Sequence, residues 1–96
     1  MDILIAYDIA DTQGAGARRL QRTAQICSSY GTRVQFSVFE CRLSPERCAR
    51  LLGELRDAID PRLDSVIIYR FDGSIIDART RLGRTAPRDI DEPWII

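Results

Sequence analysis

Alternating blocks of apolar and polar residues predict a series of strands and helices along the chain. The apolar run over residues 2–7 is rich in isoleucine and predicts a buried strand. From about Ala15 to Tyr30, apolar side chains recur at every third or fourth position, which is typical of one face of a helix. Asp11 or Thr12 is expected to cap the start of this helix, and Gly31 is expected to end it in a left-handed conformation.

The chain continues with further extended and helical patterns. Residues 33–43 alternate with a period of two, which predicts either one long bent strand or two short strands that reverse near Ser37. The sequence Ser44-Pro45-Glu46 predicts a helix start, because it supplies a hydroxyl cap, a first-turn proline and an acid. An apolar stripe follows until Pro61, which ends this helix. Residues 64–71 predict another strand.

The order of these elements predicts an α+β fold, a split βαβ sandwich with both helices on one face of an antiparallel sheet. Residues 1–72 form the core in this interpretation, and residues 73–96 form a basic C-terminal segment of the same domain. The patterns predict no third helix to cover the other face of the sheet, so we expect two chains to pack sheet to sheet as a homodimer. Trp94-Ile95-Ile96 is expected to add a further strand to a sheet edge, its own or the partner's.

Composition limits the chemistry that the chain can perform. The sequence has 96 residues, which fits one domain, and it contains no histidine. Imidazole bases, Ser-His-Asp and Cys-His nucleophile systems and histidine-ligated zinc are therefore excluded. The three cysteines include no CxxC pair, which argues against a disulfide framework or a zinc ribbon. Without a signal-peptide pattern or an apolar run near the length of a membrane span, we expect a cytoplasmic protein that does not contact a membrane.

Charge is segregated along the chain although the formal net charge is zero. All basic residues are arginines, and two tracts contain arginines without any acid. The first tract holds Arg18, Arg19, Arg22 and Arg33, and the second holds Arg79, Arg81, Arg84 and Arg88. Such tracts are typical either of phosphate contacts or of ordinary solvated faces, and both interpretations stay open here.

Asp8 is the main candidate for chemistry, because it lies where the first predicted strand meets a loop. A carboxylate there can bind Mg²⁺, and in a two-fold dimer two copies of Asp8 could share one ion. The alternative is a loop or helix-capping aspartate. Gly14-Ala15-Gly16 lacks the spacing of a phosphate-binding loop. The aromatic residues are interpreted as core or interface residues rather than as base-stacking platforms: Tyr7, Phe36, Phe39 and Tyr69.

Three segments resemble motifs of the CRISPR-associated Cas2 family. Tyr7-Asp8-Ile9-Ala10-Asp11 resembles its YDIxD motif, and Arg33-Val34-Gln35-Phe36-Ser37-Val38-Phe39-Glu40 resembles its RVQxSVFE motif. Asp64-Ser65-Val66-Ile67-Ile68-Tyr69 resembles its DSVxxY strand. The resemblance covers about residues 1–72 with the order and spacing of the motifs intact.

The resemblance implies a ferredoxin-like βαββαβ homodimer whose C-terminal strand packs against the partner subunit. It also implies a Mg²⁺-dependent endonuclease of RNA or double-stranded DNA that works beside the CRISPR integrase subunit, Cas1, in spacer acquisition. The metal-binding, catalytic aspartate of the family falls on Asp8. Its nucleic-acid-binding residues fall on Arg18, Arg19, Arg22 and Arg33, whereas the role of Asp11 is open. The alternative function is a non-catalytic, dimeric DNA-binding adaptor that bridges integrase subunits.

Overall fold

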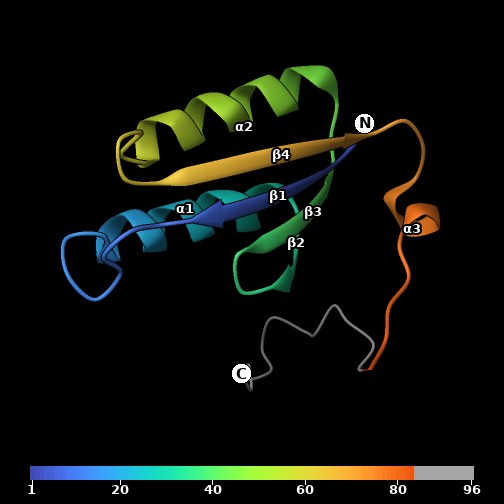
Figure 1. The fold of residues 1–96 in the computed structure, drawn as a ribbon. Coiled ribbons are helices and arrows are strands. Elements are labelled where there is room, and N and C mark those ends of the chain that lie inside the picture. Colours follow the sequence, from blue (N-terminus) through green and yellow to red (C-terminus); the bar gives the residue numbers. More distant parts are fainter. Residues whose placement is uncertain (84–96) are drawn as a thin grey trace.

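The computed structural model describes residues 1–83, and Figure 1 shows their arrangement as a sheet with helices on one side. The elements in chain order are β1 (Asp2–Asp8), α1 (Ala17–Tyr30), β2 (Thr32–Gln35), β3 (Val38–Arg42), α2 (Pro45–Ala58), β4 (Ser65–Phe71) and α3 (Ile75–Ala78). The four-stranded sheet is antiparallel with the order β2-β3-β1-β4, and α1 and α2 cover the same face (Figure 1). The predicted α+β, ferredoxin-like sandwich is therefore confirmed.

Side chains that alternate along the central strand β1 build the core. Ile3, Ile5 and Tyr7 are buried toward the helices, where the Tyr7 and Phe39 rings stack with their centroids 6.2 Å apart. Leu51 and Leu55 of α2 belong to the same cluster. Because successive strand residues point to opposite faces, the even-numbered residues of β1 lie on the face that α1 and α2 leave uncovered. We call this the open face of the sheet. It carries Leu4, Ala6 and Asp8 of β1, Val38 and Glu40 of β3, and Ile67 and Tyr69 of β4.

The extended region after α1 consists of two strands, which settles the alternative that the sequence left open. The chain reverses between β2 and β3 at Phe36 and Ser37, and the β2–β3 pairing is irregular between Arg33 and Gln35. Gly31 does not adopt the expected left-handed conformation, because its φ of −159° and ψ of −163° are extended. A Cβ at this position would instead overlap the Cys41 side chain, so close packing of α1 against β3 is what requires glycine.

The start of α1 also differs from the prediction, whereas the start of α2 agrees with it. α1 begins at Ala17 after Gly16, and no side chain in the described part of the chain caps it, so neither Asp11 nor Thr12 is its N-cap. Asp11 lies earlier in the loop, with a left-handed φ of 53°, and accepts a hydrogen bond from the Ala15 N–H at 3.1 Å. Ser44 caps α2 as predicted, and its hydroxyl accepts from the N–H of Arg47 at 3.2 Å.

The expectation that no third helix follows was wrong, because α3 forms one short helix at the end of the sheet (Figure 1). Asp2 anchors it by accepting the Ile75 N–H at 2.8 Å, and the same carboxylate pairs with Arg42 at 2.8 Å. α3 leaves much of the open face uncovered, since Ile67 and Tyr69 remain 47% and 53% exposed. The predicted strand Trp94-Ile95-Ile96 lies outside the described residues. Within residues 1–83, no helix is long and apolar enough to cross a membrane.

Candidate functional site at the end of the first strand

Asp8 ends β1 at a position where the backbone is held from two sides. It pairs with Ser65 of β4, and the N–H of its neighbour Tyr7 donates to the Ser37 carbonyl at 3.1 Å. Its side chain is exposed, and strand alternation places it at one end of the open face. A rigid strand end therefore presents this carboxylate to solvent, as a functional site requires.

The residues around Asp8 supply only part of a metal-binding shell. Within residues 1–83 no three carboxylates or thiols lie close enough to hold an ion together, and Asp8 forms no ion pair there. Asp11 is engaged in its own loop through the Ala15 N–H. Mg²⁺ commonly takes one or two carboxylates and completes its shell with water and phosphate oxygens. The Asp8 carboxylate fits such an ion as a single ligand, and two copies of Asp8 would fit it better.

A buried acid that sequence reasoning did not single out fixes the loop after Asp8. The side chain of Asp64 is fully buried and accepts hydrogen bonds from the Ala10 N–H at 2.9 Å and the Asp60 N–H at 2.8 Å. Arg19 donates to both of its oxygens, with Nε at 2.7 Å and Nη2 at 3.3 Å. Arg19 also donates from Nη2 to the Ala10 carbonyl at 3.1 Å. We call this set of contacts the Asp64–Arg19 network; it ties the β1–α1 loop to α1 and to the start of β4.

The network has a clear electrostatic signature. The Arg19 guanidinium lowers the pKa of Asp64 from 3.8 to about 2, and the two backbone N–H donors act in the same direction while burial opposes them. Asp64 in turn raises the pKa of Arg19. Both groups are therefore charged across the physiological pH range. The signal available in the sequence was the position of Asp64 as the first residue of the segment that resembles the DSVxxY strand.

The predicted nucleic-acid-binding arginines separate into two kinds in the structure. Arg18 and Arg22 are exposed on α1, a helix that contains no acidic residue. Arg19 is largely buried and its donors are taken up within the protein. Arg33 is partly buried, and its guanidinium stacks on the Phe39 ring at 5.0 Å. The structure thus brings Arg18 and Arg22 together on one surface and turns the other two inward; nucleic-acid binding by any of them stays a prediction.

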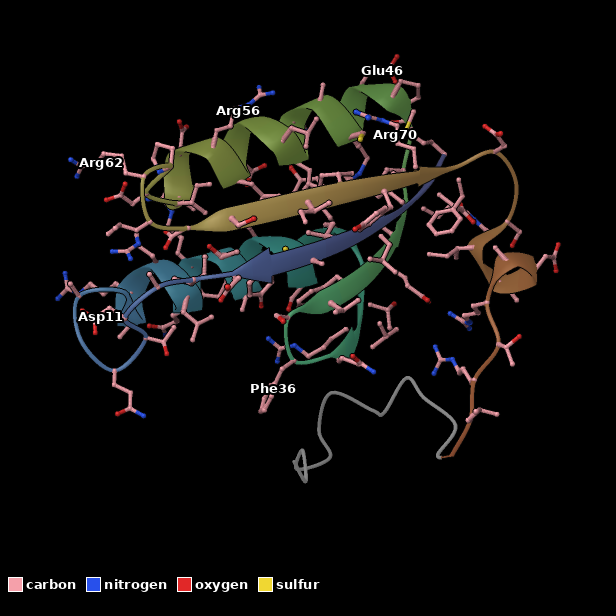
Figure 2. The ribbon with its side chains drawn as sticks, viewed as in Figure 1. Asp11, Phe36, Glu46, Arg56, Arg62 and Arg70 are labelled. Atoms are coloured by element: carbon pink, nitrogen blue, oxygen red, sulfur yellow. The ribbon has the colours of Figure 1, made fainter. Side chains whose placement is uncertain are left out.

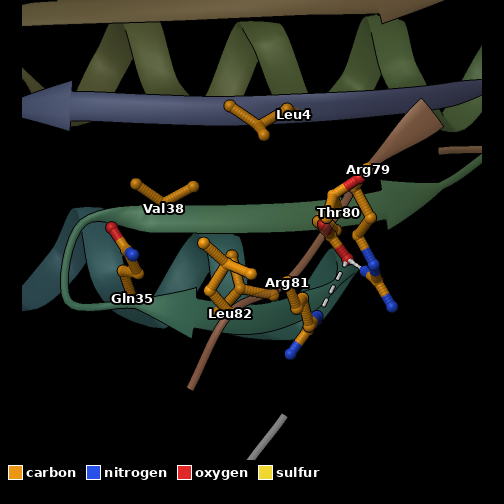
Figure 3. Close-up of a pocket in the computed structure, with 9 residues that line it drawn as sticks. Leu4, Gln35, Val38, Arg79, Thr80, Arg81 and Leu82 are labelled. Atoms are coloured by element: carbon orange, nitrogen blue, oxygen red, sulfur yellow. Dashed lines mark hydrogen bonds and ion pairs between the residues drawn. The ribbon is translucent and has the colours of Figure 1, made fainter. Parts of the chain in front are cut away.

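The described arginines of the second tract meet an acid on the open face. Arg79 donates to the Glu40 carboxylate, and Arg81 lies 3.9 Å from the same oxygen (Figure 3). Residues 79–82 run past β2 and β3 there and line a hollow together with Leu4 and Val38 (Figure 3). Pairing with Glu40 reduces the positive charge that this tract offers to a phosphate. Arg84 and Arg88 lie outside the described residues.

The cysteines are free and buried, as the sequence indicated. Burial raises the pKa of the Cys27 thiol to about 12 and that of Cys41 to about 11. Because the thiolate is the nucleophile, neither side chain is suited to covalent catalysis.

Comparisons with known proteins agree with the motifs. A family model described as CRISPR associated protein Cas2 matches residues 1–77. A CRISPR-associated endoribonuclease Cas2 of Chlorobaculum tepidum is 42% identical over 97 residues and is covered, like this chain, over 100% of its length. A CRISPR-associated endonuclease Cas2 of Halalkalibacterium halodurans is 36% identical over 99% of both chains. The crystal structure of Streptococcus pyogenes Cas2 at pH 6.5 superposes with a TM-score of 0.78 and 35% identity over 86% of this chain and 100% of that one.

Proposed function

The chain belongs to the CRISPR-associated Cas2 family, and from that membership we propose that it is a Mg²⁺-dependent endonuclease that cleaves phosphodiester bonds of RNA or DNA and takes part in spacer acquisition. The observation that carries this proposal is the exposed Asp8 carboxylate at the rigid end of β1, in a chain without histidine. The names of the curated relatives, endoribonuclease and endonuclease, support nuclease activity in general.

Each residue has a simple part in this mechanism. Asp8 would hold the ion, with the second copy of Asp8 in a homodimer as a further ligand. When bound, Mg²⁺ supplies charge neutralisation at the phosphodiester and a water of lowered pKa. Arg18 and Arg22 would bind phosphates on either side of the cleaved bond and orient the strand. The Asp64–Arg19 network holds the loop between Asp8 and these arginines in one conformation.

The homodimer itself is part of the proposal. The open face carries Ile67 and Tyr69, each about half exposed, and such apolar area on a sheet is typical of an interface. A charge placed there, Ile67→Lys, should give a light-scattering mass near that of one chain, because it would bury an unpaired ammonium. A mass that stays at twice the chain mass would contradict packing through this face. Deletion of residues 94–96 tests the predicted C-terminal contribution in the same assay.

A cleavage assay on single-stranded RNA and on double-stranded DNA, with and without Mg²⁺, tests the catalytic proposal. Asp8→Asn removes the charge with little change in shape and should abolish the Mg²⁺-dependent cleavage. Asp72→Asn is the matched control, since Asp72 is an exposed aspartate that follows β4 at the opposite end of the sheet. Full activity in Asp8→Asn, or equal loss in both variants, would contradict the assignment of Asp8.

A non-catalytic adaptor that bridges copies of the integrase subunit Cas1 on duplex DNA is the second candidate. The observation that favours it is the small ligand set, with no cluster of metal-binding groups within residues 1–83. An adaptor would need phosphate contacts but no cleavage. Spacer acquisition that persists in Asp8→Asn while cleavage is lost would make the adaptor the biological role. Loss of both activities in Asp8→Asn would favour the nuclease.

The two exposed arginines of α1 allow a test of DNA binding with a charge-matched control. Replacing Arg18 and Arg22 by glutamine should weaken duplex binding and lower the salt slope of log K by about 2, roughly one unit for each phosphate that is no longer neutralised. Arg50 and Arg56 are exposed on α2, and their double replacement changes the net charge equally. The same loss of affinity in both double variants would show a general charge effect rather than a surface on α1.

A further inference from the structure

A hollow of about 470 Å³ lies between the end of β1, α1 and the turn between β2 and β3, on the face of the sheet that Tyr7 faces. Tyr7, the residue before Asp8, forms part of its lining. Leu20 and Ala24 of α1 supply apolar surface, and Ser37 belongs to the turn between β2 and β3. The hollow is therefore assembled from three segments distant in sequence, at the same end of the sheet as Asp8.

Phe36 forms an unusual wall of this hollow. It occupies the turn between β2 and β3 and is 55% exposed, so it contributes little to the core (Figure 2). Its backbone is nevertheless fixed, because the Tyr7 hydroxyl donates to the Phe36 carbonyl at 3.3 Å. Phe36 was predicted to be a core or interface residue rather than a stacking platform; its exposed ring excludes the core alternative, and the interface alternative stays a prediction. An exposed aromatic ring on a fixed turn is typical of a stacking surface.

Among residues 1–83, the side chains that line the hollow include one arginine and no acid. Arg33 forms no ion pair with any of residues 1–83, and its Nε is buried there without a hydrogen-bond partner. The side chain is kept in place by stacking on Phe39 at 5.0 Å rather than by an acid. Gln21 of α1 adds an amide at the rim. A flat occupant with carbonyl or ring-nitrogen acceptors complements this combination of apolar walls, the Arg33 guanidinium and the Gln21 amide.

We propose that this hollow binds one unpaired nucleobase of a single-stranded nucleic acid whose backbone follows α1, with the base stacked on Phe36 and its acceptors near Arg33. Charge supports this occupant: Arg18 and Arg22 are exposed on the same helix that contributes Leu20 and Gln21, so a polyanion is attracted along it. Asp8 follows Tyr7 but points to the opposite face of the sheet, so the base site would be separate from the candidate metal site and would hold the strand at the same end of the sheet. The inference rests on the nucleic-acid binding of the proposed function but not on its cleavage.

Binding of two fluorescein-labelled hexamers in the absence of Mg²⁺ tests this inference without cleavage. One is a single-stranded uridine hexamer and the other is a fully abasic ribose-phosphate hexamer of equal length. Phe36→Ala should weaken binding of the uridine hexamer by about 5- to 150-fold, the range found when one base loses its aromatic partner. Binding of the abasic hexamer should not change. Phe36→Trp should retain the base-dependent affinity, because indole also offers a stacking surface.

Leu63→Ala is the matched control, since Leu63 is a 58% exposed apolar residue outside the hollow. Unchanged uridine binding in Phe36→Ala, or equal loss for both hexamers, would overturn the base site while leaving phosphate binding intact. If the wild-type protein bound neither hexamer, the nucleic-acid premise would fail together with this inference. A change in light-scattering mass in Phe36→Ala with no base-dependent loss would assign the hollow to a second copy of the chain and would also overturn it. If the hexamers bind in a base-dependent way but are not cleaved when Mg²⁺ is added, the result supports the base site in the hollow and contradicts only the proposed nuclease activity.

Discussion

Replacement of Asp64 by asparagine is predicted to destabilise the fold strongly, although Asp64 lies outside every candidate site found in the sequence. Asparagine keeps the size and shape of the side chain but removes its charge, and its amide NH₂ cannot accept hydrogen bonds. The side chain of Asp64 is 0% exposed and that of Arg19 is 19% exposed, so solvent screens their interaction little. The N–H groups of Ala10 and Asp60 would also lose charge-assisted acceptors.

The size of the effect follows from these contacts. Removing one partner of a buried ion pair costs about 3 to 5 kcal/mol, because the remaining charge stays desolvated. The partial exposure of Arg19 favours the lower end, about 3 kcal/mol. For a domain of this size, that loss lowers Tm by about 12 to 24 °C. Domains usually have a free energy of unfolding of about 5 to 15 kcal/mol, so Asp64→Asn should still fold at low temperature and its loss of stability can be measured.

Urea denaturation of Arg19→Gln, Asp64→Asn and the double variant measures the coupling directly. We expect a coupling energy of at least about 2 kcal/mol, within the range of double-mutant cycles on contacting residues. The control cycle uses the side chains of Asp60 and Arg62, which are 3.5 Å apart with Arg62 85% exposed. That pair should couple by less than about 0.5 kcal/mol. Equal coupling in the two cycles would refute the assignment of Asp64 as a buried anchor of the loop.

Other predictions follow from single features. The pKa of Asp64 is about 2 in the folded protein and 3.8 in an unperturbed aspartate, so its ionised carboxylate stabilises the fold above pH 4 and this stabilisation is lost as the pH falls toward 2. Urea denaturation over this pH range should show a free energy of unfolding that depends less on pH in Asp64→Asn than in the wild-type protein. Gly16→Ala should lower Tm, because its Cβ would overlap the Ala10 carbonyl, whereas Gly53→Ala, with open space around it inside α2, should raise stability by up to about 1 kcal/mol. Thr23→Val should raise the free energy of unfolding by about 1 kcal/mol, since the buried Thr23 hydroxyl has no hydrogen-bond partner within residues 1–83; an unchanged or lowered value would show that this hydroxyl is satisfied.

The elements that sequence patterns predicted well are those whose signal is local. The isoleucine-rich apolar run over residues 2–7 predicts β1, and Ser44 with Pro45 predicts the start of α2, because buried strands and helix caps are marked by residues a few positions apart. Gly31 shows the limit of such signals. Glycine after a helix usually marks a left-handed cap, but here it admits the close approach of Cys41, which is distant in the chain.

The candidate site residues also divide into those marked by a local pattern and those that depend on contacts between distant parts of the chain. Asp8 lies at a strand end that the pattern itself marks, and the structure exposes it there. Asp64 interacts with Ala10 and Arg19, which precede it by 54 and 45 residues, and no local pattern carries that information. The hollow beside Tyr7 likewise appears only when α1 and the turn at Phe36 meet in space.

The first arginine tract shows how partner residues change the interpretation of charge. The sequence alone does not distinguish the four arginines of this tract: Arg18, Arg19, Arg22 and Arg33. In the structure, Asp64 neutralises the charge of Arg19, and Arg33 stacks on the Phe39 ring. Only Arg18 and Arg22 remain as exposed charges, so this tract should contribute a salt slope of about 2 to duplex binding rather than about 4. Arg19→Gln should therefore lower Tm and leave the salt slope of duplex binding nearly unchanged. The double replacement of Arg18 and Arg22 should lower the salt slope and leave Tm nearly unchanged. Duplex titrations from 50 to 200 mM salt on about equally folded proteins separate the two cases. A salt slope that falls by one unit in Arg19→Gln would mean that Arg19 leaves Asp64 to bind phosphate.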